Sequence, residues 1–93
     1  MAAWYPGAAH EFSLRMTKKD GSLMHFDILV PGEVTNAETV YQFGRAYLQQ
    51  KGQAGQKLTA KECRLCHTET ASPGVIAAIQ RQGYSILEME GCA

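Results

Sequence analysis

The chain has no excess of charge of either sign. Its 93 residues include nine Lys and Arg and nine Asp and Glu, so the formal net charge is zero. A protein that binds nucleic acid through its phosphates usually carries a cluster of basic side chains, but Lys18 and Lys19 are the only adjacent basic residues here. The sequence therefore predicts that nucleic acids are not partners.

Long apolar runs are also missing. No stretch approaches the ~20 consecutive apolar residues of a membrane-spanning helix, and residues 1–9 lack both the basic and the apolar region of a secretory leader. We therefore expect no membrane partner and a cytoplasmic location, where thiols stay reduced. The three cysteines are an odd number, which argues against a framework of disulfides.

The composition is that of a folded protein, with 45% hydrophobic and 19% charged residues. A chain of this length forms one domain. Residues 1–9 contain Gly, Pro and four Ala without periodicity, so we expect them to be a flexible N-terminal extension. Residues 10–93 are expected to form a single α+β domain, and we expect that domain to be a monomer.

Two segments, 10–17 and 24–30, alternate apolar and polar residues in the pattern of half-buried strands. A three-residue turn that ends at Gly21 would place Met16 opposite Met24 and match apolar with apolar along the whole hairpin. A two-residue turn would instead place apolar residues opposite polar ones. We therefore predict an antiparallel hairpin with a type I turn plus bulge, in which Gly21 takes the left-handed conformation.

This register makes the other face of the hairpin mainly polar. Arg15 would lie opposite His25 and diagonal to Asp27, within reach of a charge-assisted pair. A histidine held by a carboxylate can serve as a general base. A solvated polar face explains the same residues, and we favour that interpretation.

Three helices are predicted after the hairpin. A capping box at 35–38, with Thr35 as the cap, starts the first helix, which runs to about Lys51 and stops at Gly52. A second capping box at 59–62 starts a short second helix that leads into residues 63–67.

Ser72-Pro73 starts the third helix, with Pro at the first helical position, and Gly83 ends it. Residues 84–90 are predicted to be a C-terminal strand that joins the hairpin in a small sheet. The expected order of elements is β-β-α-α-α-β.

Residues 63–67 hold two cysteines and a histidine at the spacing i, i+3 and i+4, which is one face of a helix. Thiolate sulfur and imidazole nitrogen are preferred zinc ligands, and a structural zinc site normally has four protein ligands. The last ligand must therefore come from elsewhere in the chain. The predicted metal ligands are Cys63, Cys66, His67 and Cys92, with His25 or His10 as the alternative to Cys92.

The same cluster permits three other interpretations. Cys-x-x-Cys-His is also the pattern of covalent haem attachment, but the absence of a leader and the predicted strands argue against it. A redox pair of Cys63 and Cys66 would need a lowered thiol pKa at a helix N-terminus, whereas Cys63 is expected about a turn inside its helix. Cysteines that only pack in the core remain the third alternative.

Several short motifs occur together in this chain: Asp20-Gly21, Met24-His25-Phe26-Asp27, Glu62-Cys63-Arg64-Leu65-Cys66-His67, Gly83-Tyr84 and Met89-Glu90-Gly91-Cys92. In this combination residues 10–93 resemble a bacterial family of small proteins, domain-of-unknown-function family twenty-twenty-four. The resemblance implies a compact α+β fold with a small antiparallel sheet, and no established activity, substrate or cofactor. It also implies that the matching motif positions belong to one site: His25, Asp27, Cys63, Cys66, His67 and Cys92.

From the sequence we expect a small non-enzymatic cytoplasmic domain that binds a metal ion such as zinc through its Cys/His cluster. Two alternatives stay open. One is a thiol redox protein that uses Cys63 and Cys66. The other is a protein-interaction module with structural cysteines, whose polar sheet face or Trp4-Tyr5 segment meets a partner.

Overall fold

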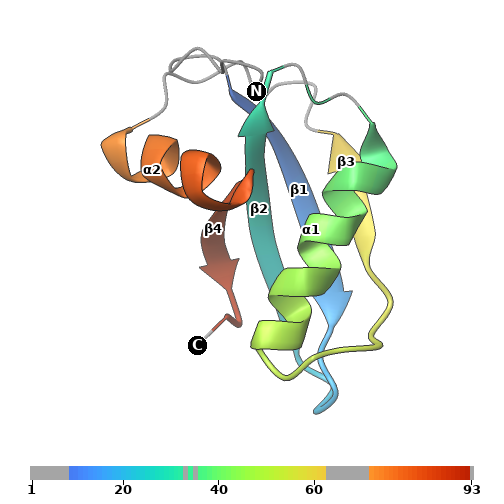
Figure 1. Cartoon of the computed structure of the whole chain (residues 1–93). Helices are drawn as coiled ribbons and strands as arrows, with labels where there is room; N and C mark the ends of the chain where they lie inside the picture. Colours follow the sequence, from blue (N-terminus) through green and yellow to red (C-terminus); the bar gives the residue numbers. More distant parts are fainter. Residues whose placement is uncertain (1–8, 33, 35, 63–71, 93) are drawn as a thin grey trace.

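A computed structural model of the chain describes residues 9–32, 34, 36–62 and 72–92. These residues form a four-stranded antiparallel sheet with both described helices on one face (Figure 1). The fold class is α+β, as predicted. The elements are β1 (Ala9–Thr17), β2 (Leu23–Pro31), α1 (Ala37–Gln50), β3 (Thr59–Glu62), α2 (Pro73–Gln82) and β4 (Ser85–Glu90).

The central hairpin has the predicted register. Met16 lies opposite Met24, and the apolar residues of β1 and β2 match along the hairpin. The N–H of Gly21 donates to the carbonyl of Lys18 at 2.9 Å, and Gly21 has a φ of 89°. Because that φ lies in the left-handed region, glycine fits this position without strain.

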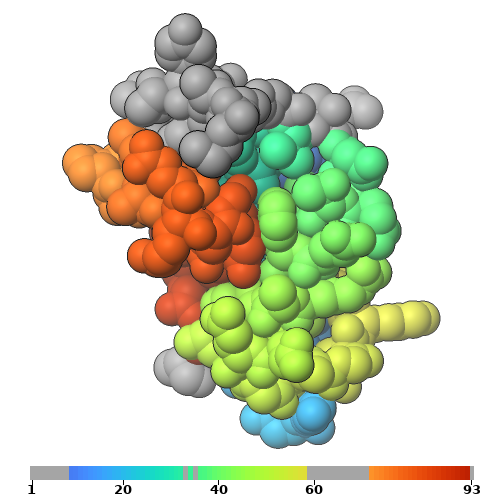
Figure 2. All heavy atoms as spheres, in the orientation of Figure 1, coloured from blue at the N-terminus to red at the C-terminus, as the bar shows by residue number. Residues whose placement is uncertain are grey.

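The helix-facing side of the sheet carries the core. Its largest fully buried side chains include Phe26, Leu14 and Ile28, and α1 packs on them with the buried residues Val40, Gly44, Tyr47 and Leu48. Figure 2 shows α1 and α2 covering this face. A Cβ at Gly44 would lie 2.6 Å from a methyl carbon of Leu58 and 2.9 Å from one of Leu14. The mid-helix glycine therefore lets α1 approach the sheet closely.

The cap of the first helix lies one residue later than predicted. Its N-cap is Asn36, whose side-chain oxygen accepts from the N–H of Glu38 at 2.8 Å. Glu38 also pairs with Arg45 at 3.1 Å. Thr35, the predicted cap, lies outside the described residues. Asn and Thr both serve well as caps, so the sequence does not rank two adjacent candidates.

The predicted second helix is wrong at its start, because Thr59–Glu62 is a strand. This segment, β3, pairs antiparallel with β1, where Arg15 lies opposite Thr59 and Phe12 lies opposite Glu62. A capping box is only a local preference, and the open edge of β1 offers backbone hydrogen bonds that outweigh it. The described elements are therefore ordered β-β-α-β-α-β, with two helices, and residues 63–71 lie outside the described part.

The C-terminal elements follow the prediction. Ser72 caps α2 with its hydroxyl oxygen 3.4 Å from the N–H of Val75, Pro73 is the first helical residue, and Gly83 ends the helix with a φ of 93°. β4 then pairs antiparallel with β2, so the strand order is β3-β1-β2-β4. Within the described ranges, no helix is long and apolar enough to cross a membrane.

Candidate functional site

The predicted pair of His25 and Asp27 lies on the sheet face opposite the two described helices. Nε2 of His25 is 3.2 Å from Oδ1 of Asp27. The same nitrogen is 2.7 Å from Oγ of Ser13, which lies opposite Asp27 on β1. We call Ser13, His25 and Asp27 the sheet-face cluster. Arg15 lies opposite His25, as predicted, but the partner of Asp27 is the imidazole.

The sheet-face cluster contains the three residue types of a hydrolase triad in a different geometry. In a triad the imidazole binds the nucleophile through one nitrogen and the carboxylate through the other. Here Ser13 and Asp27 both contact Nε2 of His25. The ring therefore cannot take a proton from the serine while its second nitrogen is held by the aspartate. Oδ1 of Asp27 is close to Nε2 but accepts no hydrogen bond from the described residues, so the carboxylate and the imidazole interact by proximity of charge and dipole alone.

Large apolar side chains flank this cluster. Leu23, Leu87 and Met89 are 58%, 46% and 54% exposed. Leu87 lies opposite Asp27 on β4, Met89 lies where the register of β4 shifts opposite His25, and Leu23 precedes His25 by two positions on β2. Clusters of exposed apolar residues on a small protein often mark an interaction site.

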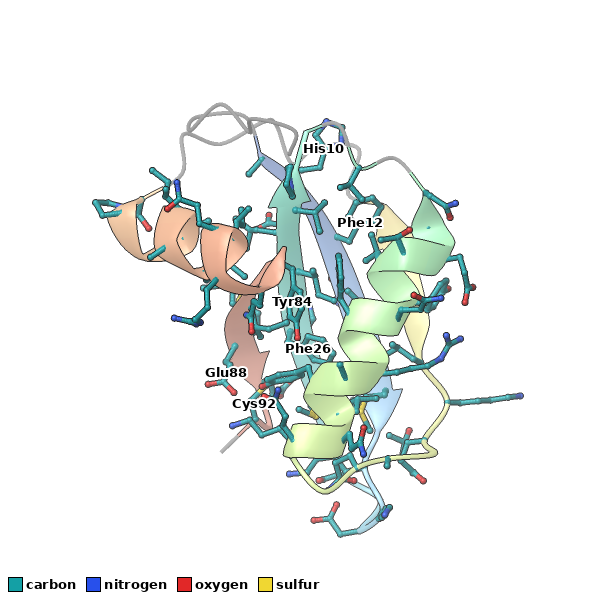
Figure 3. The ribbon with its side chains drawn as sticks, in the orientation of Figure 1. His10, Phe12, Phe26, Tyr84, Glu88 and Cys92 are labelled. Carbon is teal, nitrogen blue, oxygen red and sulfur yellow. The ribbon has the colours of Figure 1, made fainter. Side chains whose placement is uncertain are left out.

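A second group of functional side chains joins α1 to the C-terminal segment. The hydroxyl of Tyr47 donates to Oε2 of Glu88, and Nζ of Lys51 is 3.0 Å from the same oxygen. Sγ of the buried Cys92 donates to the backbone carbonyl of His25 at 3.4 Å. Figure 3 shows Glu88 and Cys92 beside the C-terminal end of α1. We call Tyr47, Lys51, Glu88 and Cys92 the Cys92 cluster.

The ionisation states in the Cys92 cluster favour hydrogen bonds that hold α1 against β4. Burial, followed by the hydrogen bonds to Glu88 and Cys92, raises the pKa of Tyr47 far above its ordinary value. The hydrogen bonds from Tyr47 and then Lys51 lower the pKa of Glu88. Tyr47 thus stays a neutral donor and Glu88 stays an ionised acceptor. This arrangement ties the helix to β4.

Gly91 explains how the end of the chain reaches this cluster. It has a φ of 66°, and a Cβ at this position would collide with the carbonyl oxygen of Leu23. Only glycine lets the backbone turn so close to β2 and place Cys92 beneath it. The glycine of the C-terminal Gly-Cys pair is thus a conformational requirement. The sequence did not reveal that Tyr47, Lys51 and Glu88 contact one another. The one local signal is that Tyr47 and Lys51 lie four residues apart on a helix.

The predicted metal site is only partly visible. Cys63, Cys66 and His67 lie outside the described residues, and the described ones include no group of three or more His, Cys, Asp or Glu that could hold a metal ion. Cys92 follows β4, one edge of the sheet, whereas the chain leaves toward Cys63 from β3, the other edge. Cys92 also meets the backbone of His25 and not its ring.

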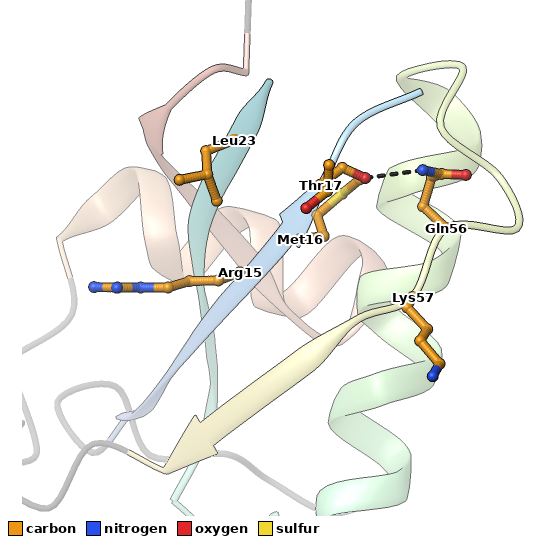
Figure 4. Close-up of a pocket in the computed structure, with 6 residues that line it drawn as sticks. All are labelled: Arg15, Met16, Thr17, Leu23, Gln56 and Lys57. Carbon is orange, nitrogen blue, oxygen red and sulfur yellow. Dashed lines mark hydrogen bonds between the residues drawn. The ribbon is translucent and has the colours of Figure 1, made fainter. Parts of the chain in front are cut away.

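An open groove of about 460 Å³ lies beside the turn of the hairpin, and Figure 4 shows its lining residues. Nε2 of Gln56 donates to the carbonyl of Thr17 at 2.9 Å, which fastens the segment before β3 to the hairpin. The side chains of Arg15 and Lys57 point away from each other in Figure 4. The two cations therefore do not converge on one small ligand, and Leu23 forms an apolar wall that continues onto the sheet face.

The comparisons with known proteins agree with this fold. The family described as Domain of unknown function (DUF2024) matches residues 9–89. The NMR structure of protein NE1680 from Nitrosomonas europaea, a structural genomics target, is similar, with 38% sequence identity and a TM-score of 0.73 over 91% of this chain and 98% of that chain. None of the curated proteins compared with the chain matches it.

Proposed function

The chain belongs to the DUF2024 family, and from that premise we propose that it is a non-enzymatic domain that binds a protein partner on the face of its sheet opposite the described helices. The observation that carries the proposal is the exposure of Leu23, Leu87 and Met89 around the sheet-face cluster. Covering a half-exposed Leu or Met contributes roughly 1 kcal/mol. Three such side chains on one face are sufficient to anchor a modest protein interface.

The polar groups at the centre of this face support a binding role. Oγ of Ser13 is 2.7 Å from Nε2 of His25, and Nε2 is 3.2 Å from Oδ1 of Asp27, so the three side chains hold one another in place. Asp27 is buried and Ser13 is half-buried, so both hold fixed positions. Fixed hydrogen-bond donors between apolar anchors give an interface its specificity.

The charge of the face indicates the chemistry of the partner. Arg15 is exposed on β1 at the side of the cluster, opposite His25. A partner segment with apolar side chains for Leu23 and Leu87 and an acidic side chain for Arg15 would complement this surface. The divergence of Arg15 and Lys57 supports a protein partner over a small anionic ligand.

The experiment is a comparison of two matched variants. The immobilised domain first captures a partner from an extract of the source cells. The partner is identified and purified, and calorimetry then measures its binding to the domain. Leu23→Lys places a charge on the sheet face, and Gln42→Lys places the same charge on the exposed side of α1. We expect the first variant to weaken binding about tenfold or more and the second to leave it unchanged.

Equal binding by both variants would show that the partner does not use the sheet face. Loss of binding only in Gln42→Lys would show that the partner binds the helices instead. Circular dichroism of both variants confirms that they are folded. The zinc and thiol-redox hypotheses concern Cys63, Cys66 and His67, which lie outside the described residues.

A further inference from the structure

The backbone edge of β4 is a second surface, although its residues Leu87 and Met89 also belong to the sheet face. β4 pairs with β2 on one side, and no strand among the described residues pairs with its other side. It spans six residues and carries the exposed side chains of Leu87 and Met89. A strand edge of this kind presents unpaired N–H and C=O groups, which are a template for another strand.

We propose that this edge pairs with the β4 edge of a second copy of the chain, antiparallel about a two-fold axis, with Leu87 opposite Leu87 of the other copy. This dimer replaces the monomer expected from the sequence. Two copies of a chain with zero formal net charge do not repel each other as whole molecules. A continuous sheet of both copies would then bury the open edge.

The register follows from which residues face each other. In an antiparallel pair about a two-fold axis, opposed positions sum to a constant and share a face. A pairing centred on Glu88 would oppose two carboxylates, which is destabilising. A pairing centred on Leu87 opposes two leucines and places Glu88 opposite Ile86 instead. It also sets Met89 opposite Ser85, which extends the apolar surface of the sheet across the interface.

Two features of the edge agree with this register. Glu88 is paired with Lys51 of its own chain at 3.0 Å, so its carboxylate needs no cation from the second copy. The register shift of β4 lies opposite the step from His25 to Phe26, after the central part of the strand. Such irregularities end strand pairing, and here the shift confines pairing to residues 85–89.

Helix α2 supplies a further contact in this arrangement. Its N-terminal turn projects beyond β4 in Figure 1. The two-fold axis places the start of one β4 beside the end of the other, so the projecting turn comes over the end of the neighbouring strand. Strand pairing over five residues buries less than the ~1,000 Å² of a stable interface, and this added contact leads us to expect a weak, concentration-dependent dimer.

The test measures mass by sedimentation equilibrium across a wide range of protein concentration. We expect the wild type to pass from monomer to dimer. Leu87→Lys opposes two like charges at the axis and should raise the dissociation constant roughly tenfold or more. Leu23→Lys, with the same change on the same face but outside β4, should dimerise as the wild type does. A monomer at every concentration, or a dimer that Leu87→Lys leaves intact, would overturn the proposal.

Cross-linking tests the register without relying on affinity. Directly opposed Cβ atoms lie within the reach of a disulfide, so oxidised glutathione should link two copies of Leu87→Cys through their new thiols, with mass spectrometry to map the bridge. Glu88→Cys is the matched control, because position 88 lies opposite position 86 in the proposed register. A bridge formed by the Glu88 variant and not by the Leu87 variant would overturn the register. Both experiments use the domain alone, so they do not depend on the partner of the sheet face.

Discussion

The thiol of Cys92 donates to the backbone carbonyl of His25 at 3.4 Å, across 67 positions of the chain. This contact joins the C-terminal motif to the Met-His-Phe-Asp motif of β2. The imidazole of His25 points its Nε2 toward Ser13 and Asp27. Two motifs that look like parts of one ligand site in the sequence are therefore joined through the backbone, with the thiol beneath the sheet and the imidazole on its outer face.

Removing the Tyr47 hydroxyl should loosen the clamp between α1 and β4. Tyr47→Phe deletes the donor to Glu88 and keeps the buried ring. We expect the free energy of unfolding to fall by about 1 kcal/mol, the usual net worth of a hydrogen bond, measured by urea denaturation. Tyr84→Phe is the control. The ring of Tyr84 stacks on Phe43, and its hydroxyl makes no hydrogen bond within the described part of the chain. An equal loss in both variants would contradict a role for the Tyr47 hydroxyl.

The same clamp predicts how stability depends on pH. The pKa of Glu88 is lowered in the folded protein from an ordinary value of 4.5. Its contribution to stability is therefore fully present above pH 4.5 and is lost as the pH falls through the lowered pKa. Urea midpoints measured between neutral and acidic pH should fall less steeply for Glu88→Gln than for the wild type. Parallel curves for the two proteins would refute this contribution.

At alkaline pH the dependence of stability on pH has the opposite sign. The pKa of Tyr47 is raised above its ordinary value of 10.0, so its contribution is present below pH 10 and is lost as the pH rises above it. We expect Tyr47→Phe to remove this alkaline loss. The measurement is the urea midpoint of both proteins in alkaline buffers. If the variant loses as much stability at alkaline pH as the wild type, other groups cause that loss.

Gly91 should tolerate substitution far less than another glycine of similar conformation. Gly91→Ala meets both the left-handed φ of 66° and a collision with the carbonyl of Leu23, whereas Gly52→Ala meets a φ of 74° in open space. The conformational cost alone is on the order of 1 kcal/mol, and we expect Gly91→Ala to exceed it clearly. Thermal unfolding of the two variants decides this, and equal losses would mean that the collision is relieved at no cost.

The zinc hypothesis is tested by native mass spectrometry of freshly purified protein with and without chelator. It predicts one zinc ion per chain that Cys63→Ser removes, and a protein that ignores added zinc would end it. Cys92→Ser tests the fourth ligand. The thiol of Cys92 already donates to the carbonyls of His25 and Glu90, so we expect this variant to keep any zinc that the wild type binds.

The hairpin and the ends of α2 were predictable because local chemistry decides them. Alternating residues of one face admit only one apolar register, and Gly21 and Gly83 supply the left-handed residues that a turn and a helix end require. β3 was not predictable in this way. The capping box at Thr59 is a genuine local signal, but the pairing of that segment with β1 depends on residues more than forty positions earlier.

The residues of the candidate site could be predicted from the sequence, but the contacts between their side chains could not. The opposition of Arg15 and His25 follows from the register, but the choice of His25 as the partner of Asp27 depends on side-chain rotamers that no pattern encodes. The link between Tyr47 and Glu88 joins a helix to a strand 41 positions away. Only the packing of α1 on the sheet brings these two residues together.

The strand order β3-β1-β2-β4 also determines the sequence of events during synthesis. The two central strands leave the ribosome first, and both flanking strands come from the second half of the chain. The newly made hairpin must therefore wait with both of its sides unpaired and its apolar face uncovered, which is a state prone to wrong association. During this interval the matched register keeps the two strands of the hairpin paired with each other.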